Sequence, residues 1–433
     1  MKLARVLPVV DKDIDVVALT PPKSTSLLST SAQDDKAHEL VNCKPLESIE
    51  AAVTTEAHEN ARRTSGRTHE EVQYVRLEQY DYDEVKGIAV IFRNAIVTGA
   101  ESLVTDCSVV YRPGGGSNFE TGAGWNIYRP LTAESPHFNW TSKVDIDRAV
   151  LLASFYAHGY FHYIVECLPR VVMVRDFVLR NPDVKIIHYP PVAADLVLLY
   201  QLLGIDPARV VEYDTKTLYR ANTLIVPTAT ATFRANTLAV QQTRDLFRDS
   251  IPGQLGIPRE DPFERARLFL SSSSPGGLIR ADRVRIVVHD RGRGKPRSVE
   301  QQKELESAIL KRFPNAEVTV YNAARANTRE MIVMHYRADV VVGPHGAGLS
   351  NALFMRRGSS MLEFNIPDRR TDPSIRCHEI TATKLGLRYF YESAVGGKHS
   401  GVMQINVDDI VAALVPIVDF HENELNSSVH LTK

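Results

Sequence analysis

The sequence predicts an α/β protein with two domains, each built around a parallel sheet. Through most of the 433-residue chain, apolar β-branched runs alternate with segments whose apolar residues recur at helical spacing. Short loops join these segments, which is typical of strands and helices alternating around a parallel sheet. A stretch rich in proline, glycine and charge at 252–261 separates two such alternations and is the expected linker. A chain of this length can bury two cores of ordinary size.

Composition limits the partners of the protein. Hydrophobic residues make up 44% of the chain and charged residues 24%, the balance of a globular protein. The net charge of −1 gives no general attraction to nucleic acid or to membranes, so any anion site must be local. No run of about 18 apolar residues occurs, and the charged start Met1–Leu19 resembles neither a signal peptide nor a transmembrane anchor.

The first domain is expected over 71–252, after a disordered leader at 1–70 that is rich in Ser, Thr, Pro and charge. A small β-rich segment opens this domain. Its expected strands are Val72–Tyr82, Gly87–Ala95, Ser102–Tyr111, Val150–Phe155, Val184–His188, Val210–Tyr213 and Asn222–Pro227. Its expected helices are Phe161–Leu179, Ala193–Leu203 and Leu238–Asp249.

The second domain is expected over 262–420 and repeats the alternation of strand and helix. Its expected strands are Arg283–Val288, Glu317–Tyr321, Asp339–Val342, Ser360–Asn365 and Arg388–Tyr391. Its expected helices are Ser298–Arg312, Thr328–Tyr336, Leu349–Phe354, Cys377–Leu385 and Asp408–Val418. Residues 421–433 are expected to form a tail. Ligands of such sheets bind outside the C-terminal ends of the strands.

A glycine-rich turn in the second domain is the strongest candidate for an anion site. The β-branched strand before it ends in Gly343-Pro344-His345, and Gly346 and Gly348 then open a helix. Such a strand end lets backbone N–H groups meet a phosphate, because glycine permits close approach and the helix start is positive. The dinucleotide pattern GxGxxG and the P-loop pattern are both absent. The alternative is a tight turn that packing alone requires.

Three polar residues beside this turn each allow two roles. His345 could bond a phosphate or organise the turn. Asn351 could bond phosphate or cap the helix locally. Glu363, on a later strand, could accept hydrogen bonds from ribose hydroxyls or could cap a neighbouring loop.

A basic cluster follows the first strand of the second domain. Arg291, Arg293, Lys295 and Arg297 fall within seven positions. The cluster could be a solvated loop, but its place after a strand would also suit an anion site. The arginine fork suits phosphate oxygens.

His162 and Glu166 are the candidates for acid–base chemistry in the first domain. They lie four residues apart, so a helix would place them on one face. A positioned histidine can take the proton of an attacking hydroxyl. The alternative is a core histidine that is satisfied by its neighbours.

We expect no metal site. The four cysteines are widely spaced and form no CxxC pair. The triplet Asp81-Tyr82-Asp83 has the form of a DxD motif but lacks the apolar strand that normally precedes one. The absence of HExxH and GxSxG argues against a hydrolase.

Four segments occur in an order that matches one family. They are Phe161–Arg170, with His162, Glu166 and Leu-Pro-Arg; Arg291 with Arg297–Gln302; Ala338–Asn351 with Phe354, Gly358 and Glu363; and Lys384–Tyr389. Together they resemble glycosyltransferase family 61, whose HGAGL signature is the most specific of the four. The resemblance covers roughly Val72 to Phe420. Gln301-Gln302 departs from the family's Asn-Glu, and Leu270–Gly294 is longer than the family pattern.

The resemblance implies a GT-B fold, with two Rossmann-like α/β domains facing a cleft. It also implies an inverting mechanism without a metal or other cofactor, and a UDP-linked pentose or N-acetylhexosamine as donor. The implied donor-binding residues are Arg291, Arg297, His345, Gly346, Ala347, Gly348, Leu349, Asn351 and Glu363. The implied catalytic residues are His162 and Glu166.

The expected function is therefore sugar transfer from a nucleotide sugar to a hydroxyl of a glycan or protein. The alternatives are a non-catalytic nucleotide-sugar or glycan-binding protein of the same fold, and a nucleotide-sugar epimerase. Eukaryotic members of the family act in the lumen of the endoplasmic reticulum or Golgi, so the resemblance implies that compartment. The sequence shows no entry signal, which leaves two alternatives: an incomplete start, or a protein that acts in the cytoplasm. We further expect Gly346→Asp to abolish donor binding and to leave the fold largely intact.

Overall fold

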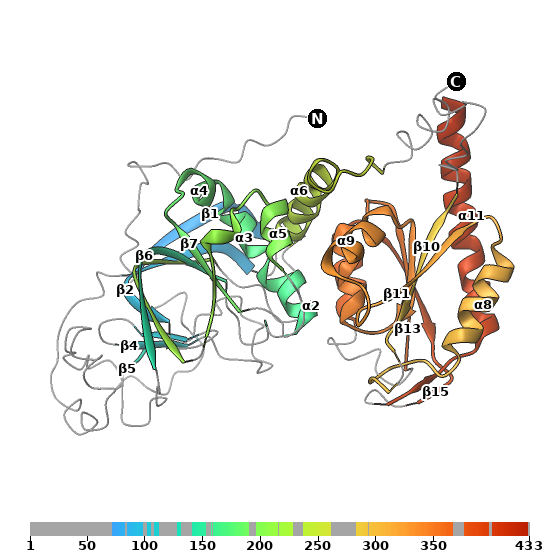
Figure 1. Cartoon of the computed structure of the whole chain (residues 1–433), viewed down its shortest axis with the longest axis horizontal. Helices are drawn as coiled ribbons and strands as arrows, with labels where there is room; N and C mark the ends of the chain where they lie inside the picture. The colour runs from blue at the N-terminus through green and yellow to red at the C-terminus, as the bar shows by residue number, and fades with distance from the viewer. Residues whose placement is uncertain are drawn as a thin grey trace. The chain divides into compact units, whose positions relative to one another are not determined.

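The structure is a computed structural model, and its description covers fifteen stretches of the chain (Figure 1). They are residues 72–82, 85–97, 102–104, 108–111, 128–130, 141–152, 157, 159–189, 196–214, 216–227, 237–260, 283–292, 294–366, 376–397 and 401–431. The expected leader at 1–70 and the last residue of the expected linker, 261, lie outside these residues. The chain divides into a first unit, 1–192 with 204–232, and a second unit, 193–203 with 233–433.

The first unit holds a nine-stranded mixed sheet. Its strands are β1 (Val72–Tyr82), β2 (Val85–Val97), β3 (Ser102–Val104), β4 (Ser108–Tyr111), β5 (Tyr128–Pro130), β6 (Ser142–Leu151), β7 (Lys185–His188), β8 (Val210–Glu212) and β9 (Thr217–Pro227). Their order is β5-β4-β3-β2-β9-β6-β7-β8, and β1 also pairs with β2. Strands β9, β6, β7 and β8 run parallel to one another.

The expected separate β-rich segment is part of this same sheet. Strand β2 pairs antiparallel with β9 from Ala89, opposite Pro227, to Val97, opposite Tyr219. Buried Phe92 and Ala95 on β2 join Ala149 and Leu224 of the parallel strands in one core cluster. The expected single strand Ser102–Tyr111 is instead the antiparallel pair β3 and β4.

Two further predictions for the first unit were wrong. The expected strand Val150–Phe155 overlaps only the end of β6, which begins at Ser142. The sequence pattern missed the first half of β6 because that half is charged and exposed and has no apolar run. The expected long helix at 161–179 is broken into α2 (Tyr160–His162), the π-helix η3 (Tyr163–Cys167), α3 (Arg170–Met173) and α4 (Arg175–Arg180). Pro169 has no N–H to continue a helical hydrogen-bond pattern, and α3 begins directly after it.

The second unit is built around a five-stranded sheet in which all strands are parallel. The strands are β10 (Arg285–Asp290), β11 (Glu317–Asn322), β12 (Val340–Pro344), β13 (Ser360–Asn365) and β14 (Arg388–Ser393), in the order β11-β10-β12-β13-β14. Its helices are α5 (Val197–Leu202), α6 (Thr237–Leu255), α8 (Gln302–Arg312), α9 (Thr328–Arg337), the 3₁₀-helix η5 (Ala347–Phe354), α10 (Cys377–Lys384) and α11 (Val407–Leu431). Two short strands, β15 (Gly396–Gly397) and β16 (Met403–Gln404), form a separate antiparallel pair.

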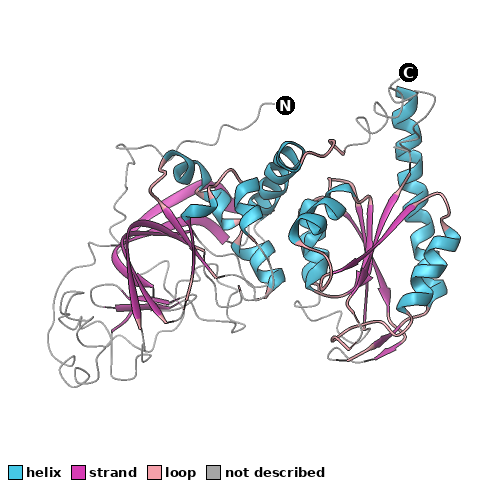
Figure 2. Ribbon diagram, viewed as in Figure 1, coloured by secondary structure: helices cyan, strands magenta, loops and turns pink. Residues whose placement is uncertain are grey.

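Helices cover both faces of this sheet, as Figure 2 shows. Helices α8 and α11 lie together on one face, and α9 covers the other (Figure 1). Val288 and Val342 of the central strands are fully buried, in one cluster with Leu305 of α8 and Leu414 of α11. Because parallel strands are covered on both sides, they are apolar along their length, and this made their positions predictable.

The boundary between the units falls earlier in the chain than the predicted 252. Helices α5 and α6 belong to the second unit, and α6 continues through Pro252 to Leu255, into the expected linker. The Arg248 guanidinium on α6 donates to the carbonyl oxygens of Tyr336 and Phe354, each at 3.0 Å. These charged hydrogen bonds fasten α6 to the second unit.

The expected tail after residue 420 is also wrong, because α11 extends to Leu431. His421 and Leu425 on this extension are buried. The His421 ring bonds the Ser360 hydroxyl through Nε2 at 2.9 Å, and Glu424 accepts from Arg356 at 2.5 Å. The last turns of α11 are therefore part of the core, packed within the second unit.

Candidate functional site

The candidate site of the second unit lies at the carboxyl ends of its parallel strands. His289 is near the end of β10, the glycine turn follows β12, and Glu363 sits on β13 with Gly343 as its register partner. The backbone N–H of His345 extends the pairing by donating to the Phe364 carbonyl at 2.9 Å. This edge is where open α/β sheets bind ligands.

Each glycine of the turn makes room for a particular side chain. A Cβ on Gly346 would overlap Nη1 of Arg291, and a Cβ on Gly343 would lie 2.5 Å from Cβ of His289. A Cβ on Gly348 would lie 3.0 Å from Nδ1 of His289. The φ of Gly346 is 166°, an extended conformation open to any residue, so contact and not backbone strain requires this glycine.

After the turn the chain forms a 3₁₀-helix instead of the expected α-helix. Leu349 and Asn351 are buried in it, and Ala347 is half-buried. Asn351 hydrogen-bonds Tyr321 at the end of β11, which lowers the pKa of that phenol, although burial raises it overall. The Asn351 side chain thus holds η5 against the sheet.

His345 is held by a buried carboxylate. Its Nδ1 bonds Oε1 of Glu363, and the second oxygen of Glu363 accepts from the Tyr389 hydroxyl at 2.8 Å. Glu363 is fully buried, and desolvation raises its pKa. Since both carboxylate oxygens are engaged within the protein, Glu363 orients the His345 imidazole through its Nδ1 atom.

Arg291 and Arg297 form a cationic pair beside the turn. Burial and the charge of Arg297 lower the pKa of Arg291 to about 10. Its Nη1 donates to the carbonyl oxygen of His345 at 3.3 Å, and its Nε is buried without a hydrogen-bond partner among the described residues. Arg297 has a φ of 61°, the left-handed region that favours glycine. Lys295 is exposed, and Arg293 lies outside the described residues.

A buried pair of histidines packs against the glycine turn. The sequence analysis did not identify this pair. Nε2 of His289 lies 2.9 Å from Nε2 of His335, and the ring of Tyr321 contacts both. Burial lowers the pKa of His335 to about 4, and burial together with the neighbouring His335 lowers the pKa of His289 well below its usual value. His289 directly follows the expected strand Arg283–Val288, and that position at a strand end was the signal that could have marked it as a candidate site residue.

In the first unit, His162 and Glu166 form a pair as their spacing predicted. His162 Nδ1 lies 3.0 Å from Oε2 of Glu166, and the two side chains are 16% and 8% exposed. His162 ends α2, and Glu166 lies in the π-helix η3. Single π-helical turns occur often at functional sites.

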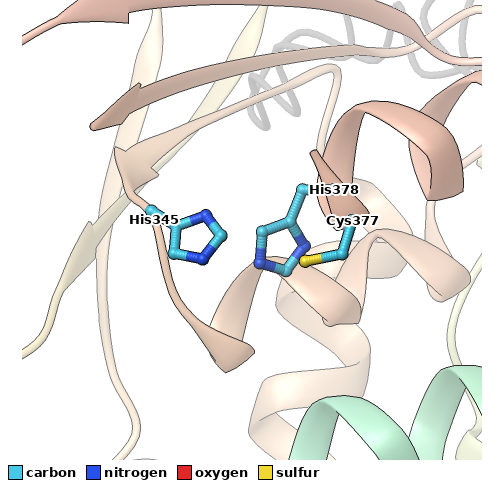
Figure 3. A group of neighbouring side chains, drawn as sticks. All are labelled: His345, Cys377 and His378. Carbon is cyan, nitrogen blue, oxygen red and sulfur yellow. The ribbon is translucent and has the colours of Figure 1, made fainter. Parts of the chain in front are cut away.

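One cluster in the described residues has the composition of a metal site, although no metal site was expected. His345, Cys377 and His378 are all buried and lie beside one another (Figure 3). The adjacent Cys377-His378 pair was visible in the sequence but had no motif to mark it. The Asp81–Asp83 triplet extends outside the described residues.

The two sheets and their flanking helices make this an α/β protein of the Rossmann-like kind. The sequence model of the family described as Glycosyltransferase 61 matches residues 160–362. The chain therefore carries a glycosyltransferase family 61 domain over these residues, as predicted. Such a domain implies sugar transfer between a sugar donor and an acceptor.

Other comparisons are weaker. No curated protein matches the chain. Among solved structures, an azoreductase from Bacillus anthracis str. Sterne is 10% identical, with a TM-score of 0.18, over 34% of this chain and 95% of its own. A flavodiiron protein from Giardia intestinalis is 12% identical, with a TM-score of 0.22, over 59% of this chain and 77% of its own. Within the described residues, every helix is too short or too polar to cross a bilayer.

Proposed function

We propose that this protein is an inverting glycosyltransferase of the GT-B fold, with the nucleotide sugar bound by the second unit and the acceptor by the first. The donor is a UDP-linked pentose or N-acetylhexosamine, and the acceptor is a hydroxyl of a glycan or protein. The family match supports sugar transfer, and the wholly parallel sheet of the second unit supports a nucleotide-binding domain.

The observation that carries the donor site is the cationic pair at the glycine turn. Burial of a guanidinium costs free energy unless hydrogen bonds or an anion offset it. Arg291 is half-buried, its Nε has no hydrogen-bond partner among the described residues, and the like charge of Arg297 acts on it. A diphosphate would supply the missing acceptors through bidentate hydrogen bonds.

The glycine turn completes the proposed donor site. Backbone N–H groups of Gly346, Ala347 and Gly348, at the start of η5, would face the same anion, whereas the N–H of Leu349 donates to the carbonyl oxygen of Gly346 at 3.0 Å and closes the first turn. His345 would shape the turn that meets the anion, while Glu363 holds its ring and Asn351 holds η5. In this proposal Glu363 and Asn351 act through their neighbours as positioning residues.

The reaction would proceed by a single displacement. An acceptor oxygen attacks the anomeric carbon, the bond from that carbon to the phosphate oxygen breaks, and its electron pair passes to the diphosphate. Arg291 and Arg297 would stabilise the charge that grows on the leaving group. His162, oriented by Glu166, would take the acceptor's proton.

Binding and transfer can be tested separately with the full chain. Titration calorimetry with UDP should give a binding constant that weakens at least ~10-fold in Arg291→Gln, because a charged hydrogen bond contributes about 1.5–3 kcal/mol. Arg325→Gln is the matched control, since Arg325 is an exposed arginine of the same unit. A panel of UDP-sugars, screened by thermal shift, should identify the donor as the one that raises the melting temperature most.

The proposed base is tested by turnover with the donor found in that screen. His162→Ala and Glu166→Gln should lower kcat by ~10²–10⁴-fold and leave UDP affinity unchanged. UDP binding without any transfer or donor hydrolysis in the wild type would instead identify a non-catalytic binding protein. Release of an epimerised free sugar without an acceptor would identify an epimerase.

A further inference from the structure

Three buried side chains with metal-binding atoms meet beside the glycine turn. A ring nitrogen of His345, a ring nitrogen of His378 and Sγ of Cys377 all lie within 4.8 Å of one another. The rings of His345 and His378 have centroids 5.1 Å apart. Figure 3 shows His345 on the turn that follows β12, and Cys377 with His378 at the start of α10.

Hydrogen bonds around this cluster already orient both imidazoles as a metal would need. His345 uses Nδ1 to bond the Glu363 carboxylate, which directs Nε2 away from it. His378 hydrogen-bonds the backbone of Gly346, so a neutral ring presents its other nitrogen as a lone pair. Metal-bound histidines characteristically donate their second nitrogen to a carboxylate or a backbone carbonyl.

The third candidate ligand is a cysteine that forms no disulfide with the described residues. Cys377 is buried, and its Sγ lies beside the two imidazoles. Two imidazoles and one thiolate form a ligand set that suits Zn²⁺, whereas Mg²⁺ and Ca²⁺ prefer oxygen ligands.

We propose that His345, Cys377 and His378 bind one Zn²⁺ ion that fastens α10 to the glycine turn. Tetrahedral bonds to nitrogen and sulfur would bring the three ligand atoms to ~3.5 Å from one another, a movement of about 1 Å that side-chain rotation can supply. The thiol releases its proton to solvent on binding. Water takes the fourth position. This site goes beyond the proposed function, because sugar transfer was expected without a metal.

The test measures zinc itself in the full-length protein. After purification, chelation and addition of ZnCl₂, the protein is desalted and its zinc content is determined by mass spectrometry. The wild type and Cys167→Ser, which alters the other buried free cysteine, should retain one equivalent. Cys377→Ser and His378→Ala should bind Zn²⁺ at least ~100-fold more weakly in competition with a chromophoric chelator.

A second measurement needs no variant and so does not depend on how the variants fold. Co²⁺ added to the chelated wild type should give a thiolate-to-metal charge-transfer band and tetrahedral d–d bands. Wild-type protein without stoichiometric zinc, cobalt protein without the thiolate band, or Cys377→Ser with wild-type affinity would each overturn the proposal. UDP titration of the same samples reports on the proposed donor site separately, so failure of one proposal is distinguishable from failure of the other.

Discussion

His289 and His335 share a hydrogen bond between their Nε2 atoms, 2.9 Å apart, in the interior of the second unit. Nδ1 of His335 lies 2.8 Å from the carbonyl oxygen of Met331, and a carbonyl can only accept. In two neutral rings, His335 therefore accepts at Nε2 and His289 donates there. This leaves Nδ1 of His289 as a hydrogen-bond acceptor directed toward Gly348.

This pair predicts a loss of stability in mild acid. Burial lowers the pKa of His335 to about 4, against 6.5 in an unfolded chain, so between these values the unfolded state binds more protons. The contribution of neutral His335 to the free energy of unfolding is therefore fully present above pH 6.5. It decreases as the pH falls toward 4, by up to about 1.4 kcal/mol per pH unit.

Denaturant unfolding followed by circular dichroism between pH 7 and 4.5 measures that slope. His335→Phe removes the titrating group and should flatten the slope, whatever its effect at pH 7. Equal slopes in wild type and variant would show that His335 is not held neutral by the fold.

Two alanine substitutions in the glycine turn should have different effects. Gly343→Ala places a methyl group 2.5 Å from Cβ of His289 and should destabilise the protein by about 1–3 kcal/mol, as overpacking does. Gly346→Ala adopts the extended φ without strain and instead displaces the Arg291 guanidinium. It should weaken UDP binding by ~10-fold or more with a small change in melting temperature.

Gly253→Ala is the control for both, because nothing lies within 4 Å of a Cβ at that position. Thermal denaturation and UDP calorimetry on the three variants separate the two effects. A large drop in melting temperature for Gly346→Ala, or none for Gly343→Ala, would contradict this assignment.

Arg297 combines a strained backbone with a proposed role in donor binding. Its φ of 61° costs an L-residue about 1 kcal/mol that glycine does not incur. Arg297→Gly should therefore be more stable than Arg297→Ala by about 1 kcal/mol, while both lose UDP affinity to the same degree. Chemical denaturation and calorimetry of the pair test this, and equal stabilities would argue against the left-handed conformation.

Glu424 should stabilise the end of α11 in a pH-dependent way. Hydrogen bonds from His421 and Arg356 lower its pKa from 4.5 to about 2. Between these values the folded state binds fewer protons than the unfolded state. The contribution of the Glu424 carboxylate to the free energy of unfolding is therefore fully present above pH 4.5 and is lost as the pH falls toward 2. Because the side chain is 31% exposed, we expect Glu424→Gln to cost only about 1–2 kcal/mol at pH 7.

The exposed Glu422→Gln on the same helix is the matched control. Melting temperatures of both variants at pH 7 and at pH 3 should show a deficit for Glu424→Gln that shrinks at low pH. A deficit that persists unchanged in acid would mean that the contact does not depend on the charge.

The second unit could be predicted almost entirely from the sequence, and the first could not. Strand β12 was predicted to within two residues because Val340, Val341 and Val342 form a continuous apolar run, as in a parallel strand that is covered on both faces. Helix α9 was predicted within a residue because Asn327 and Glu330 form a capping box before a periodic apolar pattern. In the first unit, the exposed half of β6 and the π-helix after His162 follow no such regular pattern.

Part of the candidate site could likewise be predicted from the sequence, and part could not. The glycine turn and the arginine loop have local patterns, and the match to family 61 covers both. The roles of Glu363 and His289 depend on contacts between residues far apart in the chain, Glu363 with His345 and His289 with His335. Spacing along the sequence does not show which of these side chains contact one another, even where a motif contains both partners.

The path of the chain between the units limits how the protein can be dissected. Residues 193–203 belong to the second unit, 204–232 return to the first, and everything from 233 onward belongs to the second. A fragment that starts at residue 262 would lose α5 and α6, leaving the ring of Phe354 without Phe247 and two carbonyls without Arg248. No single cut yields both units whole, so isolated-domain work on this enzyme would require a circular permutation or two co-expressed pieces.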